Sequence, residues 1–157
     1  AEAERLREIV DRTPEPPPDR QNTPPSDMNE TTPARLLVSV MVADGDLRQG
    51  EQRFVDGWLA REGHPSLDPR DMRVWRPQEL GPVPDAATAE RLLEACVHLA
   101  HLDRERDGSE WKVILAFARA WGVSEERVRQ WDREYDRRYS TGMTRLWRTL
   151  THLVRPR

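Results

Sequence analysis

The sequence contains a single cysteine, Cys96, and only two phenylalanines and two tyrosines among 157 residues. One cysteine cannot form an intramolecular disulfide, and it fits a reducing compartment. Because other aromatic residues are so few, the six tryptophans must supply most of the large side chains of the core. Lysine is nearly absent as well: Lys112 is the only one, so arginine carries almost all of the positive charge.

The chain also lacks an apolar run long enough to cross a bilayer, and it lacks a positively charged start followed by an apolar signal core. We therefore expect a soluble, cytoplasmic protein. Because the sequence does not begin with methionine, it is compatible with a fragment of a larger protein and with a membrane segment upstream of Ala1. The net charge of −3, spread over both signs, favours neither nucleic acid nor an anionic membrane as partner.

The length suits one domain preceded by a tether. Residues 1–12 have the apolar spacing of a short helix, and the following residues are rich in proline and small polar side chains, which is typical of an extended linker. We assign residues 1–32 to this short helix and flexible linker, and residues 33–157 to one helical domain.

Apolar residues at helical spacing predict several helices after the linker, and no alternating run predicts a sheet. The helix that starts at Thr32 is apolar nearly all round and must be buried. Capping or helix-breaking residues mark the expected boundaries: Thr32, Gly63, Asp85, Gly122, Ser124 and Gly142. Residues 64–84 contain five prolines and can hold at most a short helix near residues 69–75. The predicted fold class is all-α.

One short acidic stretch occurs twice, at residues 43–51 and 102–110, in the sequence Ala-Asp-Gly-Asp-Leu-Arg-Gln-Gly-Glu and then Leu-Asp-Arg-Glu-Arg-Asp-Gly-Ser-Glu. Each copy lies between an apolar helical segment and an amphipathic one, which indicates a duplicated helical hairpin. We therefore expect a compact bundle of two pseudo-symmetric hairpins whose acidic loops converge on one site.

These loops offer the oxygen ligands that a hard divalent cation such as calcium or magnesium prefers. The candidate metal ligands are Asp44, Asp46, Glu51, Asp103, Glu105, Asp107 and Glu110. Gly45 permits a left-handed turn that brings flanking oxygens round one point. The second loop is not an EF-hand, because Ile114 stands where a bidentate glutamate belongs. Helix capping, with Asp107 and Glu110 as a capping box, is the competing interpretation.

The motif at residues 43–51, Ala-Asp-Gly-x-Leu-x-x-x-Glu, and its repeat, Ala-His-Leu-Asp at residues 100–103 leading to Glu110, resemble the tellurite-resistance TerB-like family. Residues 118–124, Ala-x-x-Trp-Gly-Val-Ser, resemble the closing Leu-Gly-Leu-Ser element of that family. The resemblance covers roughly residues 33–135. Arg104 departs from the family's glycine, and the insertion at residues 64–84 is unusual for it.

The resemblance implies a non-enzymatic, all-helical scaffold that binds protein partners. It also implies a bacterial stress response of the tellurite-resistance kind, divalent-metal binding, and proximity to the inner membrane, as in a membrane-anchored DnaJ-like co-chaperone. By position, the family's acidic residues correspond to Asp44, Glu51, Asp103 and Glu110. The identity of the partner does not follow from it.

Three other interpretations use different residues. A metal-dependent hydrolase could use His98, His101 and Asp103, since the two histidines share a helical face. Cys96 as a nucleophile is disfavoured, because a cysteine between apolar helical residues is usually inert packing. The arginine-rich segment after Ser124 is interleaved with acidic residues, so we expect an ion-paired, solvated face and no nucleic-acid binding.

Overall fold

The computed structural model describes residues 28–102 and 108–153, with side chains as far as residue 140. Among these residues it has five α-helices, two short 3-10 helices and no strand, so the predicted all-α class is confirmed. The helices of the first hairpin are α2 (Thr32–Met41) and α3 (Gln49–Arg61), and those of the second are α4 (Ala86–Leu102) and α5 (Gly108–Ala120). The last helix is α6 (Glu125–Leu153), and the 3-10 helices are η1 (Pro69–Asp71) and η2 (Pro77–Glu79).

Most of the predicted helix boundaries are observed. The Asp85 carboxylate accepts a hydrogen bond from the Thr88 amide at 2.9 Å and so caps α4, while the Ser124 hydroxyl accepts one from the Arg127 amide at 3.2 Å at the start of α6. Gly63 and Gly122 take φ values of +72° and +71° just after α3 and α5, a conformation in which glycine is favoured. The N-cap of α2 is Thr31, one residue earlier than predicted.

Helices α2 and α4 lie at the centre of the bundle. Helix α2 packs against α3, α4 and α5, and α4 packs against all four other helices. Every residue of α2 except Arg35 is buried, as its apolar sequence predicted. Burial of one such leucine or valine side chain stabilises the fold by about 1.5–3 kcal/mol.

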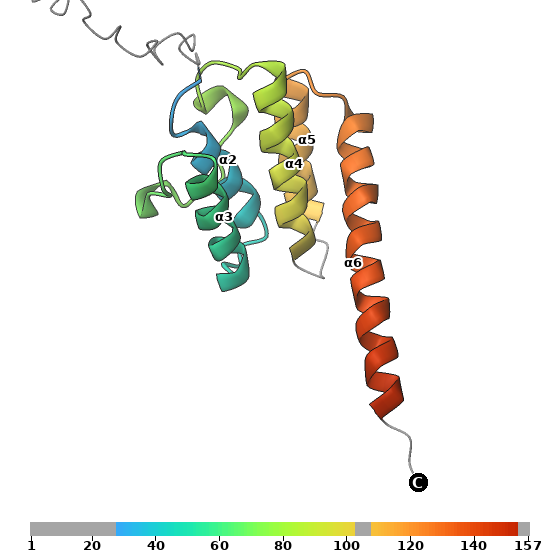
Figure 1. Ribbon diagram of the computed structural model, residues 1–157. Helices are drawn as coiled ribbons and strands as arrows, with labels where there is room; N and C mark the ends of the chain where they lie inside the picture. Colours follow the sequence, from blue (N-terminus) through green and yellow to red (C-terminus); the bar gives the residue numbers. More distant parts are fainter. Residues whose placement is uncertain (1–27, 103–107, 154–157) are drawn as a thin grey trace, which may run out of the picture.

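In both helix pairs, the first helix ends and the second begins at the same end of the bundle. In Figure 1, α2 and α4 run towards the lower end of the molecule, while α3 and α5 start there and run back. The turn at residues 42–48 and the ends of α4 and α5 at residues 102 and 108 therefore lie at this end. The linker side of the domain, where residue 28 leads into α2, is at the opposite end.

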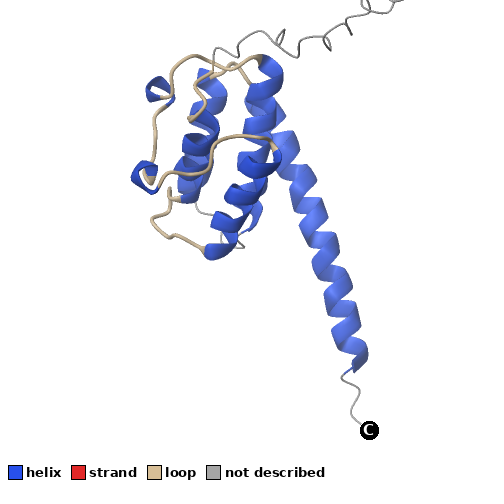
Figure 2. Ribbon diagram, turned by 60° about the vertical axis from the view of Figure 1, so that its left-hand side comes forward, coloured by secondary structure: helices blue, strands red, loops and turns tan. Residues whose placement is uncertain are grey.

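The insertion at residues 64–84 forms a strap across α2. The Thr32 hydroxyl donates to the Leu80 carbonyl at 2.9 Å, and the Trp75 amide donates to the Ser39 hydroxyl at 2.8 Å. Arg35 of α2 forms an ion pair with Asp71 at 3.1 Å. Figure 2 shows this segment as loop with two short helical turns along one side of the bundle. The strap thus binds the face of α2 that carries Thr32, Arg35 and Ser39, and it contains a second helical turn, η2, that its prolines did not predict.

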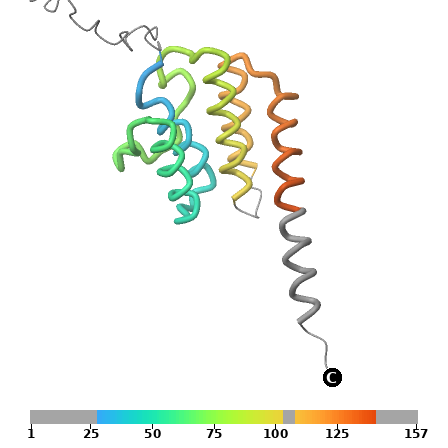
Figure 3. Tube along the Cα trace, viewed as in Figure 1, coloured from blue at the N-terminus to red at the C-terminus, as the bar shows by residue number. Residues whose placement is uncertain are grey.

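The prediction of a separate helix after Gly142 is wrong, because α6 continues as one helix from Glu125 to Leu153. A glycine inside a helix costs about 1 kcal/mol relative to alanine, and the segment has no proline before residue 156 to stop the helix. Figure 3 traces the first part of this helix alongside α4.

Candidate functional site

The first acidic turn is closed by its own side chain. The Asp44 carboxylate accepts a hydrogen bond from the Asp46 amide at 2.9 Å, and the Gly45 amide donates to the Val42 carbonyl at 3.1 Å. Gly45 has φ +84°, as the sequence predicted for a left-handed turn. Asp46 and Leu47 are exposed at the tip, where 54% of the Leu47 surface is accessible. One oxygen of Asp44 is therefore engaged in the turn, while the Asp46 carboxylate faces solvent.

The two glutamates that the repeat aligns, Glu51 and Glu110, are both buried, each with 3% of its surface exposed. Each lies in the first turn of its helix, Glu51 in α3 and Glu110 in α5. The partial positive charge of a helix N-terminus favours a carboxylate there, which offsets part of the cost of removing it from water. Both residues thus share one environment at equivalent helix positions.

Three of the predicted metal ligands, Asp103, Glu105 and Asp107, lie outside the described residues. Among residues 28–102 and 108–140, no group of three or more His, Cys, Asp or Glu side chains is arranged to hold a metal ion. Asp44, Asp46 and Glu51 lie at or next to the turn between α2 and α3, and Glu110 lies in the first turn of α5, so these four residues are at the same end of the bundle.

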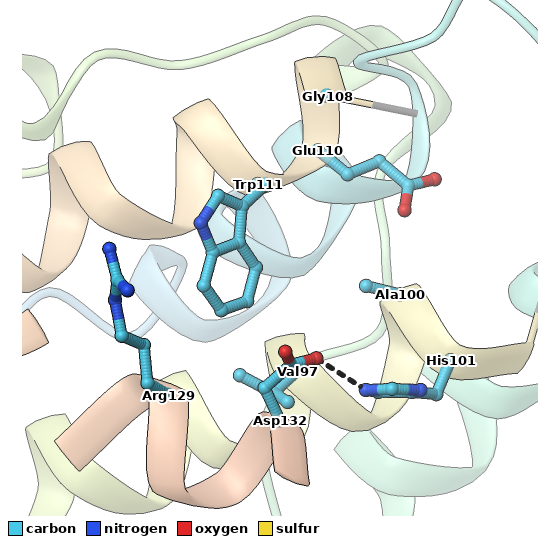
Figure 4. A pocket seen from close by; sticks show the side chains of 8 residues that line it. All are labelled: Val97, Ala100, His101, Gly108, Glu110, Trp111, Arg129 and Asp132. Atoms are coloured by element: carbon cyan, nitrogen blue, oxygen red, sulfur yellow. Dashed lines mark hydrogen bonds and ion pairs between the residues drawn. The ribbon is translucent and has the colours of Figure 1, made fainter. Parts of the chain in front are cut away.

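A pocket of about 410 Å³ opens between α4, α5 and α6 at this end. Its apolar surface includes Val97 and the indole of Trp111, and its polar residues include His101 and Glu110. Figure 4 shows the remaining lining residues around them, with Arg129 on the side of the indole and Asp132 beside the imidazole. The pocket therefore combines an aromatic wall with ionisable groups of both signs.

His101 connects α4 to α6. Its Nε2 lies 2.8 Å from Asp132 Oδ1 and its Nδ1 lies 3.6 Å from Asp136 Oδ1 (Figure 4 shows the shorter contact). Only 8% of the imidazole surface is exposed. The ring also stacks on Tyr139, with centroids 6.1 Å apart and planes 7° from parallel. Two carboxylates of one helix thus flank a buried imidazole of another.

His98 connects the same two helices one turn earlier. Its Nε2 forms a 3.0 Å hydrogen bond with the Tyr139 hydroxyl, and its ring stacks on Tyr135 at 4.6 Å. Phe54 of α3 also packs against the His98 ring in a T-shaped arrangement, with ring centroids 4.7 Å apart. Burial lowers the pKa of His98, and the charge of Arg138 adds to this effect. The neutral imidazole is therefore the form that this packing favours.

Both histidines of the hydrolase interpretation therefore have partners on α6, and its third residue, Asp103, lies outside the described residues. These partners were not predicted from the sequence. Asp132 and Asp136 were expected only as counterions of nearby arginines, although their spacing of four residues places both on one helical face. The available signal for His101 was this pair of aspartates, and for His98 it was the pair of tyrosines at positions 135 and 139, which have the same spacing of four.

Cys96 is fully buried in α4, and burial raises the pKa of its thiol. A thiol held protonated away from solvent is a poor nucleophile, which agrees with the prediction of inert packing. The predicted ion-paired arginine face of α6 is also observed: Arg129 contacts Glu125 at 2.6 Å and Arg133 contacts Glu126 at 2.9 Å.

No helix in the described part of the chain combines the length and apolarity needed to span a bilayer. Comparisons of the chain with protein-family models, with curated proteins and with solved structures find no match.

Proposed function

We propose that the chain is a non-enzymatic helical interaction module of the TerB-like kind, built from two pseudo-symmetric hairpins, and that it binds a protein partner through the end where the hairpins turn. The supporting observation is the common setting of Glu51 and Glu110. These residues are 59 positions apart in the repeat, yet both are buried to 97% in the first turn of their helices. The resemblance of the two acidic motifs to the TerB-like family suggests a role in bacterial stress response near the inner membrane.

The first turn has the features of a contact surface. Leu47 is exposed at its tip between Asp46 and Arg48, and Gly45 gives the turn a defined conformation. An apolar side chain held by an ordered turn loses little conformational entropy on binding, so it can serve as an anchor for a partner. Neighbouring carboxylates favour a partner with basic groups at its rim.

Site-specific photo-crosslinking in cells tests the docking surface. A crosslinking residue at position 47 is compared with one at Val83 of the strap, because the two side chains are equally exposed, at 54% and 55%. We expect a discrete crosslinked protein from position 47 and not from position 83. We also expect Asp46→Lys to reduce the yield of that product. The same products from both positions would show that the turn has no special role.

We further propose that a divalent cation, calcium or magnesium, binds at this end with Asp44, Asp46, Glu51 and Glu110 among its ligands and with Asp103, Glu105 and Asp107 of the second loop. Thermal melting with calcium or magnesium is compared with melting in chelator. A cation present at about 100 times its Kd stabilises the folded state by about 2.7 kcal/mol.

The double variant Asp44→Asn with Asp46→Asn separates charge from turn structure, because an asparagine at residue 44 can still accept the amide hydrogen bond that closes the turn. The variant is expected to lose the cation-dependent rise in Tm, while Asp56→Asn on the exposed side of α3 keeps it. If the double variant keeps the full rise, these carboxylates do not bind the ion.

The hydrolase that would use His98, His101 and Asp103 is the second candidate, and the pocket beside His101 is the observation in its favour. Zinc binding distinguishes this hydrolase site from the proposed calcium or magnesium site, because imidazole nitrogen suits zinc and carboxylate oxygen suits calcium. A zinc-dependent rise in Tm that His101→Ala abolishes and Asp44→Asn leaves intact would favour the hydrolase.

A further inference from the structure

The pocket between α4, α5 and α6 has the size and the walls of a small-molecule site. Its volume of about 410 Å³ lies within the range of about 300–1,000 Å³ that is typical of ligand pockets. Val97 and Ala100 of α4 and the indole of Trp111 from α5 supply its apolar walls. An apolar pocket with a few polar groups favours an organic ligand over a bare ion.

Two side chains of opposite charge line this pocket from the same helix. Arg129 and Asp132 of α6 are three positions apart, so their Cβ atoms lie about 5–6 Å from each other. In Figure 4, Arg129 lies on one side of the cavity and Asp132 on the other, and the Trp111 indole faces them from α5. The pocket therefore presents a cation and an anion within reach of one small molecule.

Both charged side chains are held in place by neighbours. Arg129 donates through Nε and Nη2 to Glu125 Oε1, at 3.2 and 2.6 Å, which uses part of the hydrogen-bonding capacity of its guanidinium. Asp132 contacts His101 Nε2 through Oδ1 at 2.8 Å, and a carboxylate accepts several hydrogen bonds at once. Each group can therefore bind a ligand together with its neighbour, and it loses little side-chain entropy when it does so.

We propose that this pocket binds a free α-amino acid with an apolar or aromatic side chain. Arg129 pairs with the carboxylate of the ligand, Asp132 accepts hydrogen bonds from its ammonium group, and Trp111 packs against its side chain. The inference is independent of the proposed docking at the first acidic turn.

Other ligand classes fit the charges of the pocket less well. A simple amine would bring a positive charge to Arg129, and a simple carboxylic acid would bring a negative charge to Asp132. A second acid, Glu110, also lines the pocket, which disfavours a purely anionic ligand such as a phosphate ester. A peptide terminus carries one of the two charges, whereas a free α-amino acid carries both on a single carbon.

Thermal melting of the full chain tests the inference first. L-Leucine, L-phenylalanine and L-tryptophan are added at millimolar concentrations, in the presence of a chelator. We expect at least one of them to raise the Tm, because a ligand that binds only the folded state stabilises it. If none of the three raises the Tm, the pocket does not bind amino acids of this class.

Isothermal titration calorimetry then compares the best of these amino acids with the matching amine and the matching acid. For L-phenylalanine these analogues are phenethylamine, which lacks the carboxylate, and phenylpropionate, which lacks the ammonium group. We expect each analogue to bind at least about tenfold more weakly, because it loses a hydrogen-bonded charge pair. This comparison uses the wild-type chain, so it does not depend on the folding of any variant.

Variants assign the binding to the pocket. Arg129→Gln and Asp132→Asn are each expected to weaken binding about tenfold. Arg133→Gln is the matched control: the Arg133 and Arg129 side chains are both 57% exposed and both pair with a glutamate of α6, but Arg133 does not line the pocket. The control is expected to bind within about twofold of the wild type.

Four outcomes would overturn the inference. An amine that binds as tightly as the amino acid would show a site for cations, and an equally tight acid would show a site for anions. Equal loss of binding in Arg133→Gln and Arg129→Gln would assign the effect to total charge. Binding that requires zinc and disappears with chelator would assign the pocket to the hydrolase interpretation. Asp46→Lys, which tests the docking surface, is expected to leave amino-acid binding unchanged, so the two proposals can fail separately.

Discussion

The contact between His101 and Asp132 offers a quantitative test of how α6 is fastened to the bundle. The two polar atoms are 2.8 Å apart, the imidazole is 8% exposed and the carboxylate is 23% exposed. A hydrogen bond to a charged group contributes about 1.5–3 kcal/mol to the free energy of unfolding. Because water still reaches the carboxylate and replaces part of the bond when it is broken, we expect a coupling energy of about 1–2 kcal/mol.

The assay is a double-mutant cycle with His101→Ala and Asp132→Ala, in which the free energy of unfolding of the wild type and three variants is measured by urea denaturation and circular dichroism. The cycle is needed because Asp132 makes further interactions, and these cancel when the single variants are subtracted. A second cycle pairs His101→Ala with Asp136→Ala. That carboxylate is 3.6 Å away and 52% exposed, so its coupling should stay below about 0.5 kcal/mol.

The reasoning would be refuted by a coupling within about 0.3 kcal/mol of zero for His101 and Asp132, which is the usual error of additivity for independent sites. Equal couplings in the two cycles would also contradict it, because distance and burial would then have no bearing on the energy. In either case, packing of the aromatic rings would have to account for the attachment of α6.

Three further predictions concern single residues. The pKa of His98 lies below 6.5 because the ring is buried, so the unfolded chain binds more protons and the free energy of unfolding should fall as pH drops below about 6.5; His98→Gln should reduce that slope in urea titrations at several pH values. Cys96 should react with a thiol reagent only in denaturant, and native reactivity at the denatured rate would contradict its burial. Ser39→Ala should lower the free energy of unfolding by about 1–3 kcal/mol because the Trp75 amide loses its acceptor, whereas Ser66→Ala should change it by less than about 0.5 kcal/mol.

Much of the helical framework was predictable because its signals are local. Asp85 and Ser124 cap helices through residues three positions away, and Gly63 and Gly122 end helices through their own φ angles. The burial of α2 followed from its composition alone. Where the signal was weak the prediction failed, as at Gly142, whose helix penalty of about 1 kcal/mol was too small to interrupt α6.

The candidate site was predictable only in part. The repeat predicted that Glu51 and Glu110 occupy equivalent positions at helix starts, but the partners of the histidines were not predicted. Asp132 is 31 residues from His101, and many carboxylates of this chain have the chemistry to pair with an imidazole. The choice among them depends on how α6 lies against α4, which only packing of the apolar faces determines.

The sequence by itself determined most of the helix boundaries and the turn at Gly45, because these depend on residues only a few positions apart. The tertiary structure alone decided that residues 64–84 bind across α2 through Ser39 and that His98 and His101 attach α6. Hydrogen bonds between residues 31 to 48 positions apart leave no periodic pattern in a sequence. They form only after burial of apolar faces has brought the helices together.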